Sequence, residues 1–185
     1  MQGLEAHRSM DIEHYLQHPD AYLLGGTDTE IALTSSTDNR HAALALISQA
    51  QRSVQIFSRD LDAPVYDQAP FVHTLTALAT RSRHTRILIL VQNTERVVAD
   101  GHRLIELSRR LSSFIDIRKP HGDFREYNQA FLIADGVGLL RRPIADRYQG
   151  TLNFKAPLAA REYTEFFAQV WERSEADPNL RQLHI

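Results

Sequence analysis

The sequence predicts a single-domain α/β/α sandwich built around a mixed β-sheet. Helical and strand patterns alternate through the first two thirds of the chain, which is typical of parallel strands joined by helices. Three short strand candidates then follow, separated by turns that contain glycine or proline, which is typical of an antiparallel meander. The chain has 185 residues and no internal repeat or low-complexity linker, so its length suits one domain with a sizeable core.

The N-terminal segment is expected to be a polar arm and loop over residues 1–37, followed by the domain proper over 38–185. Within the arm, a short helix is predicted over 11–18 and a short strand over 31–34. His14 and His18 are four residues apart, a spacing that places two metal ligands on one helical face. No third ligand follows them, so a solvated arm is the preferred interpretation and no metal site is predicted.

The alternating part of the domain extends to residue 118. Residues 38–40 are expected to cap a helix over 41–51, in which alanine, leucine and isoleucine recur at helical spacing. The continuous apolar run 86–91 is typical of a strand buried on both faces. The same criteria predict strands over 53–58, 86–91 and 114–118, helices over 71–83 and 101–112, and loops over 60–69 and 92–100.

The last third of the domain carries the meander and one long helix. Strands are predicted over 129–134, 138–141 and 150–155. A helix over 157–174 begins with proline, which suits the first helical position. Its core side chains are expected to be Phe166, Phe167, Val170 and Trp171.

Composition excludes several classes of protein. Hydrophobic residues make up 43% and charged residues 24% of the chain, which argues against a disordered or collagenous protein. Because the chain has no cysteine, it has no disulfide framework, thiolate nucleophile or cysteine-ligated metal. No apolar run approaches the roughly 20 residues that span a bilayer, and the N-terminus lacks a signal-peptide pattern. A cytoplasmic protein is expected.

The net charge of −2 conceals two charged regions. Residues 1–40 carry two arginines against seven acidic residues, whereas residues 81–125 carry ten basic residues against five acidic ones. Of the 21 basic residues only Lys119 and Lys155 are lysines. Arginine suits bidentate contacts with carboxylate or phosphate, although the codon bias of a GC-rich bacterial genome explains the same content more simply. One functional alternative is therefore nucleic-acid binding through the 81–125 basic region.

Candidate binding residues lie where predicted strands end and helices begin, since the phosphate-binding glycine loops, G-x-S-x-G and H-E-x-x-H are all absent. Arg59 and Asp60 follow a central strand, where ligands of α/β sheets bind, although the two could also pair with each other. His102 opens a helix, where backbone N–H groups favour anions. A capping or solvated role explains His102 equally well.

One segment resembles a known family. Residues 128–135, NQAFLIAD, followed by Gly136, resemble the signature strand of the phospholipase D superfamily, whose motif is His-x-Lys-x-x-x-x-Asp. Residues 46–57 are similar to the helix and strand with which members of that superfamily begin. In element order the resemblance covers residues 38–174 and implies a phospholipase D-like fold.

The resemblance implies the fold but argues against the family reaction. Asn128 stands in place of the nucleophilic histidine and Ala130 in place of the phosphate-binding lysine, while Asp135 is kept. In the family an imidazole attacks phosphorus and a second copy of the motif protonates the leaving group. Since an asparagine amide does neither, the expected function is a non-catalytic binding or regulatory module for an anionic or phosphate-bearing ligand, without a cofactor.

The resemblance also implies partners. The family builds its site from two halves and this chain has room for one, so a homodimer is implied. The resemblance also implies an association with N-acetyltransferase domains and hence an accessory role to an acetyltransferase. The catalytic alternative is a phosphodiesterase or nuclease-like hydrolase in which His102 or His121 replaces the lost histidine.

The remaining candidates follow the motif strand. Arg141 and Arg142 could surround the vacated pocket and hold a phosphate or carboxylate, or they could form a solvated surface. The family's Gly-Ser-x-Asn segment at its usual spacing falls on Arg142 and Pro143, whereas a longer connection places it on 150–153 and ends at Asn153. The full set of predicted ligand-binding residues is Arg59, Asp60, His102, Asn128, Asp135, Arg141, Arg142 and Asn153, with no metal ligand and no catalytic residue.

Overall fold

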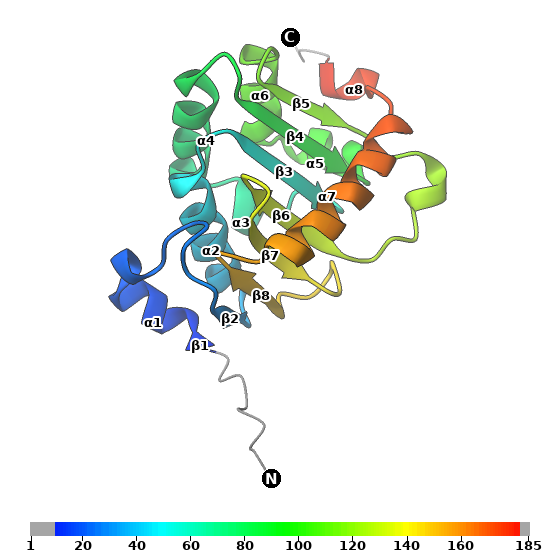
Figure 1. Cartoon of the computed structure of the whole chain (residues 1–185). Helices are drawn as coiled ribbons and strands as arrows, with labels where there is room; N and C mark the ends of the chain where they lie inside the picture. The colour runs from blue at the N-terminus through cyan, green and yellow to red at the C-terminus, as the bar shows by residue number, and fades with distance from the viewer. Residues whose placement is uncertain (1–9, 182–185) are drawn as a thin grey trace.

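An eight-stranded mixed β-sheet organises the chain in the computed structural model, which describes residues 10–181 (Figure 1). The strand order across the sheet is β1-β2-β8-β7-β6-β3-β4-β5. The strands are β1 (Met10–Asp11), β2 (Glu30–Leu33), β3 (Ser53–Ser58), β4 (Arg86–Val91), β5 (Ile115–Arg118), β6 (Ala130–Ala134), β7 (Gly138–Arg142) and β8 (Gly150–Asn153). The predicted α/β sandwich with a mixed sheet is confirmed.

Strand direction defines two ends of the sheet. β3, β4 and β5 are parallel, while β6, β7 and β8 continue from β3 as an antiparallel meander. β2 pairs antiparallel with β8, and β1 pairs parallel with β2. We call the end at which β3, β4 and β5 finish the carboxyl end, and the end at which they start the amino end. Because β6 runs against β3, its first residue lies at the carboxyl end and its last residue at the amino end.

Helices cover the two faces unequally (Figure 1). α2 to α6 lie on one face, and α7 crosses the other. The helices are α1 (Ile12–Gln17), α2 (Ser36–Gln49), α3 (Ala63–Tyr66), α4 (Ala69–Arg81), α5 (Thr94–Asp100), α6 (Arg103–Arg110), α7 (Pro157–Glu172) and α8 (Pro178–Arg181), with 3₁₀ turns η1 (Pro19–Ala21) and η2 (Gly122–Phe124). No helix among the described residues is both long and apolar enough to cross a membrane.

Side-chain alternation along the strands separates two hydrophobic cores. Val54 and Ile56 of β3 face α2 to α6 and belong to the larger core. Phe57, one residue further, faces α7 and joins an aromatic core with Phe131 of β6 and Phe167 of α7. All five residues of β6 are buried, so the strand that carries the motif is central and cannot shift register without exposing apolar side chains.

Three sequence expectations about elements are wrong, each for a local reason. α2 begins at Ser36, two residues before the predicted cap, because Ser35 and Asp38 form a capping box: Asp38 N–H donates to Ser35 Oγ at 3.1 Å, and Ser35 N–H donates to Asp38 Oδ2 at 3.0 Å. The predicted loop 92–100 contains α5, whose first turn is capped by Asn93 Oδ1. The predicted loop 60–69 contains α3. Both helices have seven residues or fewer, too short for a clear helical period.

The N-terminal segment contributes to the sheet. β2 lies one residue before the predicted 31–34 strand and pairs with β8 along four residues. Its inward side chains, Ile31 and Leu33, are buried in the larger core. Residues before position 38 are therefore part of the packed fold as well as a connecting arm.

Candidate functional site

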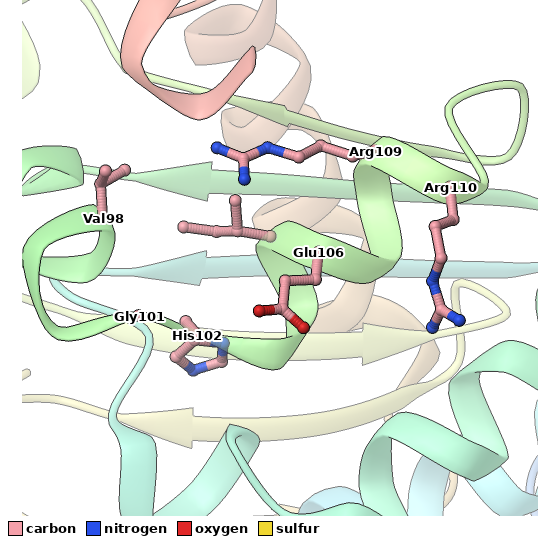
Figure 2. A pocket seen from close by; sticks show the side chains of 7 residues that line it. Val98, Gly101, His102, Glu106, Arg109 and Arg110 are labelled. Atoms are coloured by element: carbon pink, nitrogen blue, oxygen red, sulfur yellow. The ribbon is translucent and has the colours of Figure 1, made fainter. Parts of the chain in front are cut away.

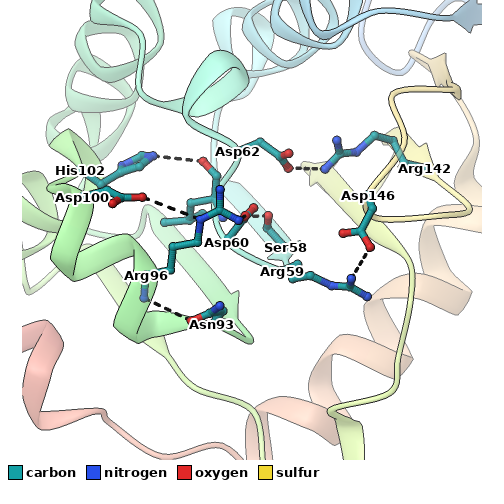
Figure 3. A network of polar contacts seen from close by, with 11 residues as sticks. Ser58, Arg59, Asp60, Asp62, Asn93, Arg96, Asp100, His102, Arg142 and Asp146 are labelled. Carbon is teal, nitrogen blue, oxygen red and sulfur yellow. Dashed lines mark hydrogen bonds and ion pairs between the residues drawn. The ribbon is translucent and has the colours of Figure 1, made fainter.

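The candidate site lies at the carboxyl end of the sheet, where four loops meet (Figure 3). These are the loop after β3, the residues before β6, the loop after β7 and the junction between α5 and α6. In doubly wound sheets, ligands bind outside the carboxyl ends of parallel strands. Five of the eight predicted ligand residues lie in this region: Arg59, Asp60, His102, Asn128 and Arg142.

Arg59 joins the loop after β3 to the residue that replaces the family's histidine. Its Nη2 donates to Asn128 Oδ1 at 2.8 Å, and its Nη1 forms an ion pair with Asp146. The backbone of the same loops is also joined, because Ala145 N–H donates to Asn128 C=O at 3.0 Å. The Arg59 side chain is 35% exposed and that of Asp146 63% exposed, so water reaches this pair.

Arg142 and Asp62 form a second, buried ion pair. Only 4% of the Arg142 side chain and 15% of the Asp62 side chain are exposed. Burial by itself lowers the pKa of Arg142, but the hydrogen bond to Asp62 and the nearby tyrosines outweigh it, so the pKa is raised and the guanidinium stays charged. Asp62 satisfies Nη2, while Nη1 is buried without a hydrogen-bond partner among the described residues.

Two tyrosines surround this buried guanidinium. Arg142 Cζ lies 5.5 Å from the centroid of the Tyr148 ring, within cation–π range. Tyr66 is fully buried, and burial raises the pKa of its phenol well above the usual value. The buried Asn39 of α2 donates to Tyr148 C=O at 2.7 Å and so fixes the loop after β7 against α2.

His102 is a structural cap in this arrangement. Its Nε2 donates to Leu61 C=O at 3.1 Å, and its Nδ1 accepts from Leu104 N–H at 3.1 Å at the start of α6. Because one ring nitrogen donates and the other accepts, the ring is the neutral form. Burial lowers the pKa of His102, which agrees with this protonation state.

Leu61 shows that the loop after β3 is held under strain. Its φ of 54° lies in the left-handed region, which side chains other than glycine rarely adopt. Leu61 N–H donates to the buried Ser58 Oγ at 3.1 Å, and its carbonyl accepts from His102. These two bonds fix the loop that positions Arg59 and Asp60.

Asp60 faces a small acidic cavity of about 260 Å³ between this loop and α5. The cavity is lined by three carboxylates, from Asp60, Asp62 and Asp100, and by Arg96. Arg96 donates to Asp60 Oδ2 at 2.9 Å and lies 3.8 Å from Asp100. Within residues 10–181, no cluster of three or more histidine and carboxylate side chains is suited to hold a metal ion.

Asp135 lies at the other end of β6, away from Asn128. Its carboxylate accepts three backbone hydrogen bonds, from Gln51 (2.7 Å), Arg52 (2.9 Å) and Ser53 (2.9 Å), and thereby fixes the start of β3. Asp135 and Gly136 have φ values of 50° and 70°, which suit the hairpin turn between β6 and β7. The motif aspartate therefore holds the amino end of the sheet together.

Arg141 and Asn153 also lie apart from Asn128. Arg141 alternates with Arg142, so it faces the α7 side, where it contacts Thr151 (3.2 Å) and Glu30 (3.6 Å). Asn153 is paired in register with Leu139 near the amino end of the sheet. Its amide donates to Asp28 at 3.0 Å, and its carbonyl oxygen accepts from Lys155 N–H.

Sequence reasoning missed three residues that contact the arginines of the site. Asp62, Asp146 and Tyr148 were not among the predicted residues, because they lie in irregular loops without a motif. The one available signal was the family's Gly-Ser-x-Asn spacing, which falls on Arg142 and Pro143 and so marks the end of β7. That spacing locates the loop carrying Asp146 and Tyr148 beside the motif strand.

A larger cavity, of about 600 Å³, lies between α5 and α6 on the outer side of His102 (Figure 2). Its lining includes His102, Glu106, Arg109 and Arg110. Figure 2 shows Arg109 and Arg110 pointing in different directions, so their guanidinium groups do not converge on one ligand position. The paired groups at the carboxyl end of the sheet are the better candidate site.

The fold is similar to those of three solved proteins. Nuc, a phospholipase D family member from Salmonella typhimurium, matches with a TM-score of 0.60 and 15% identity over 82% of this chain and 99% of Nuc. NucT from Helicobacter pylori matches with a TM-score of 0.57 and 11% identity over 82% of this chain and 100% of NucT. Phosphatidylserine synthase from Haemophilus influenzae matches with a TM-score of 0.54 and 14% identity over 86% of this chain and 42% of its own.

These likenesses confirm the phospholipase D-like fold that the motif strand predicts. At such low identity they establish the fold and leave the reaction open. No curated protein sequence matches the chain. A family model does, across residues 35–183, and the chain thus belongs to the family described as domain of unknown function DUF7931.

Proposed function

We propose that the carboxyl end of the sheet is a non-catalytic binding site for a small anionic ligand that carries a phosphate or carboxylate group. The observation that carries the proposal is the contact between Arg59 and Asn128. Asn128 takes the place that the resemblance assigns to the nucleophilic histidine, and its amide oxygen accepts a hydrogen bond from Arg59. A neutral amide neither attacks phosphorus nor relays a proton near neutral pH.

Asp146 suggests how such a ligand binds. Arg59 uses one nitrogen for Asn128 and the other for the carboxylate of Asp146, which is well exposed. A ligand phosphate or carboxylate offers Arg59 the same charge and geometry as Asp146 does. We therefore expect the ligand to displace Asp146 and to retain the contact between Arg59 and Asn128.

A titration with inorganic phosphate and with adenosine monophosphate, followed by NMR or calorimetry, tests this proposal. Arg59→Ala should weaken binding at least about tenfold, since it removes a charged hydrogen-bond donor. Asp146→Ala should strengthen binding, because it removes the competing carboxylate. Arg125→Ala is the matched control, as this exposed arginine has no ion-pair partner among the described residues. Equal binding by wild type and Arg59→Ala would contradict the proposal.

The catalytic alternative makes a different prediction. A relocated nucleophile needs a free ring nitrogen, and both ring nitrogens of His102 are engaged. His121 is about half exposed, and its Nδ1 contacts Asp123 N–H and Arg173. Turnover of bis(p-nitrophenyl) phosphate that disappears in His121→Ala would favour a hydrolase over a binding module.

Self-association is part of the same proposal. The resemblance to a family that builds its site from two halves implies a site completed by two copies of the chain. Light scattering coupled to size-exclusion chromatography should give the mass of a dimer, whereas a monomer at high protein concentration would contradict it. The acetyltransferase partner stays a prediction from the resemblance.

A further inference from the structure

The amino end of the sheet carries a group of exposed arginines. Arg52 precedes β3, Arg83 and Arg86 flank the turn into β4, Arg81 ends α4 and Arg110 ends α6. We call these five residues the amino-end arginines. Backbone pairing makes the central ones neighbours, because Arg86 N–H donates to Arg52 C=O at 3.0 Å and adjacent strands lie about 4.8 Å apart.

The side chains of the amino-end arginines form no hydrogen bond or ion pair with a carboxylate among the described residues. Among the described residues, none of the amino-end arginines forms an ion pair, and those with hydrogen bonds use neutral acceptors. Arg81 donates to Ala50 C=O and Gln51 Oε1, and Arg86 donates to backbone carbonyls. The adjacent carboxylate, Asp135, accepts backbone N–H groups with both of its oxygens, one of them from Arg52, so its charge offsets part of the positive charge of the group without an ion pair to any of the side chains.

Part of the group has a structural explanation. Arg81 and Arg110 lie in the last turns of helices, where a cation stabilises the negative end of the helix dipole. Figure 2 shows the Arg110 side chain extending in a different direction from that of Arg109, although both line the same cavity. Arg52, Arg83 and Arg86 lie outside helices. A functional inference therefore rests on these three.

We infer that Arg52, Arg83 and Arg86 form a surface that binds the phosphodiester backbone of a nucleic acid, at the opposite end of the sheet from the proposed Arg59 site. Guanidinium groups bind phosphate oxygens in bidentate fashion and keep their charge at all physiological pH values. Exposed guanidinium groups on neighbouring strand starts, without ion-pair partners, meet the electrostatic requirement for sequence-independent phosphate binding. The surface contains Arg83 and Arg86 from the predicted 81–125 region and adds Arg52 from outside it.

The surroundings favour a nucleic acid over a membrane. Amphipathic segments that bind anionic lipid combine basic side chains with apolar ones that enter the membrane interface. The large apolar residues exposed in the described part of the chain are Leu16, Leu23, Ile144 and Leu158, none of which belongs to the segments that carry the three arginines. The arginines surround the polar Ser82 and His84 instead.

Fluorescence anisotropy with a labelled DNA duplex and a labelled single-stranded RNA, each of about 20 nucleotides per strand, tests the inference at several salt concentrations. Wild-type affinity should fall linearly with salt on a double-logarithmic plot. The triple variant Arg52→Ala, Arg83→Ala, Arg86→Ala should bind at least about tenfold more weakly at low salt. For this variant, the slope of log affinity against log salt concentration should be smaller in magnitude by about 2 to 3, because each phosphate contact on duplex DNA contributes about 0.9 to it. Comparing the affinities for RNA and for DNA shows which of the two nucleic acids the surface binds.

A control variant that removes the same positive charge elsewhere distinguishes an effect of this surface from an effect of net charge. Arg125→Ala, Arg147→Ala, Arg161→Ala removes three exposed arginines elsewhere and should leave the affinity within about twofold. Equal losses in both triple variants, absence of binding to both polymers at low salt, or binding to phosphatidylserine vesicles but to neither polymer would each overturn the inference. Arg59→Ala should leave nucleic-acid binding intact, so the inference and the proposed anion site fail independently.

Discussion

The two ends of one β-sheet use arginine in opposite ways. At the carboxyl end, Arg59, Arg96 and Arg142 each contact an aspartate. At the amino end, Arg52 and Arg86 form no ion pair within residues 10–181. Arg86 and Arg96 belong to the same basic stretch of sequence, yet only one of them has a charged partner. Regional charge therefore does not reveal which arginines are available for a ligand; the folded arrangement of carboxylates decides that.

The aspartates at the two ends have different partners. Asp62 neutralises a buried guanidinium at the carboxyl end, whereas Asp135 accepts backbone N–H groups at the amino end. Each acid is thus committed to the structure. Asp146, which is exposed, is the carboxylate whose removal should change binding more than stability.

The buried pair at the carboxyl end should give the largest effect on stability. Asp62→Ala leaves the Arg142 guanidinium buried without its charge partner, and we expect the free energy of unfolding in urea to fall by about 3 kcal/mol. Replacing both residues, as Asp62→Ala with Arg142→Met, should recover much of that loss because no uncompensated charge remains. A loss below about 1 kcal/mol in the single variant would show that water solvates Arg142 in the folded state.

Variants of Asp135 test how much this carboxylate contributes to stability at the amino end of the sheet. Asp135→Ala removes three charge-assisted hydrogen bonds, and we expect unfolding in urea to require about 2 kcal/mol less. Asp135→Asn should lose less, since asparagine tolerates the positive φ and still accepts hydrogen bonds. Asp146→Ala is the control and should stay within about 0.5 kcal/mol of wild type. If Asp135→Ala matched that control, the kept motif residue would not be a structural one.

The sequence predicts most of the fold because its strands are strongly patterned. The buried run 86–91 and the alternating 53–58 correspond to β4 and β3 with the same bounds. Short helices were missed where capping alone specifies them, as in α5, which is specified by Asn93. Ser35 was missed although Ser35 and Asp38 fit the capping-box pattern of a serine followed three residues later by an acidic residue, because the prediction assigned the cap to residues 38–40.

The candidate site is less predictable because its residues meet only in the folded sheet. Arg59 and Asn128 lie far apart in sequence, and their contact depends on the antiparallel pairing of β3 with β6. Conversely, Asn128 and Asp135 share one motif, yet a five-residue strand separates them to opposite ends of the sheet. A motif thus fixes spacing along the chain, while strand direction decides which of its members can bind together.

His102 allows a smaller, pH-dependent test of the carboxyl end. Burial lowers its pKa, and this outweighs the opposing effect of Asp67. The unfolded chain, with a histidine pKa of about 6.5, therefore binds more protons than the folded chain at acidic pH, so the free energy of unfolding should fall as the pH decreases below about 6.5. His102→Asn keeps an acceptor for Leu104 N–H but does not titrate, and its unfolding should depend less on pH. An unchanged pH profile would mean that other groups cause the dependence.

The smallest effect on stability is expected at the amino-end arginines, and this small effect sharpens the contrast between the two ends. Arg52→Ala, Arg83→Ala and Arg86→Ala remove exposed side chains without ion-pair partners in the described structure, so each should change the free energy of unfolding by less than about 0.5 kcal/mol. Thermal unfolding monitored by circular dichroism measures this directly. A large loss would mean that these arginines hold the strand starts together, as Asp135 does. A negligible loss combined with weaker nucleic-acid binding would mean that their charge serves a ligand rather than the fold.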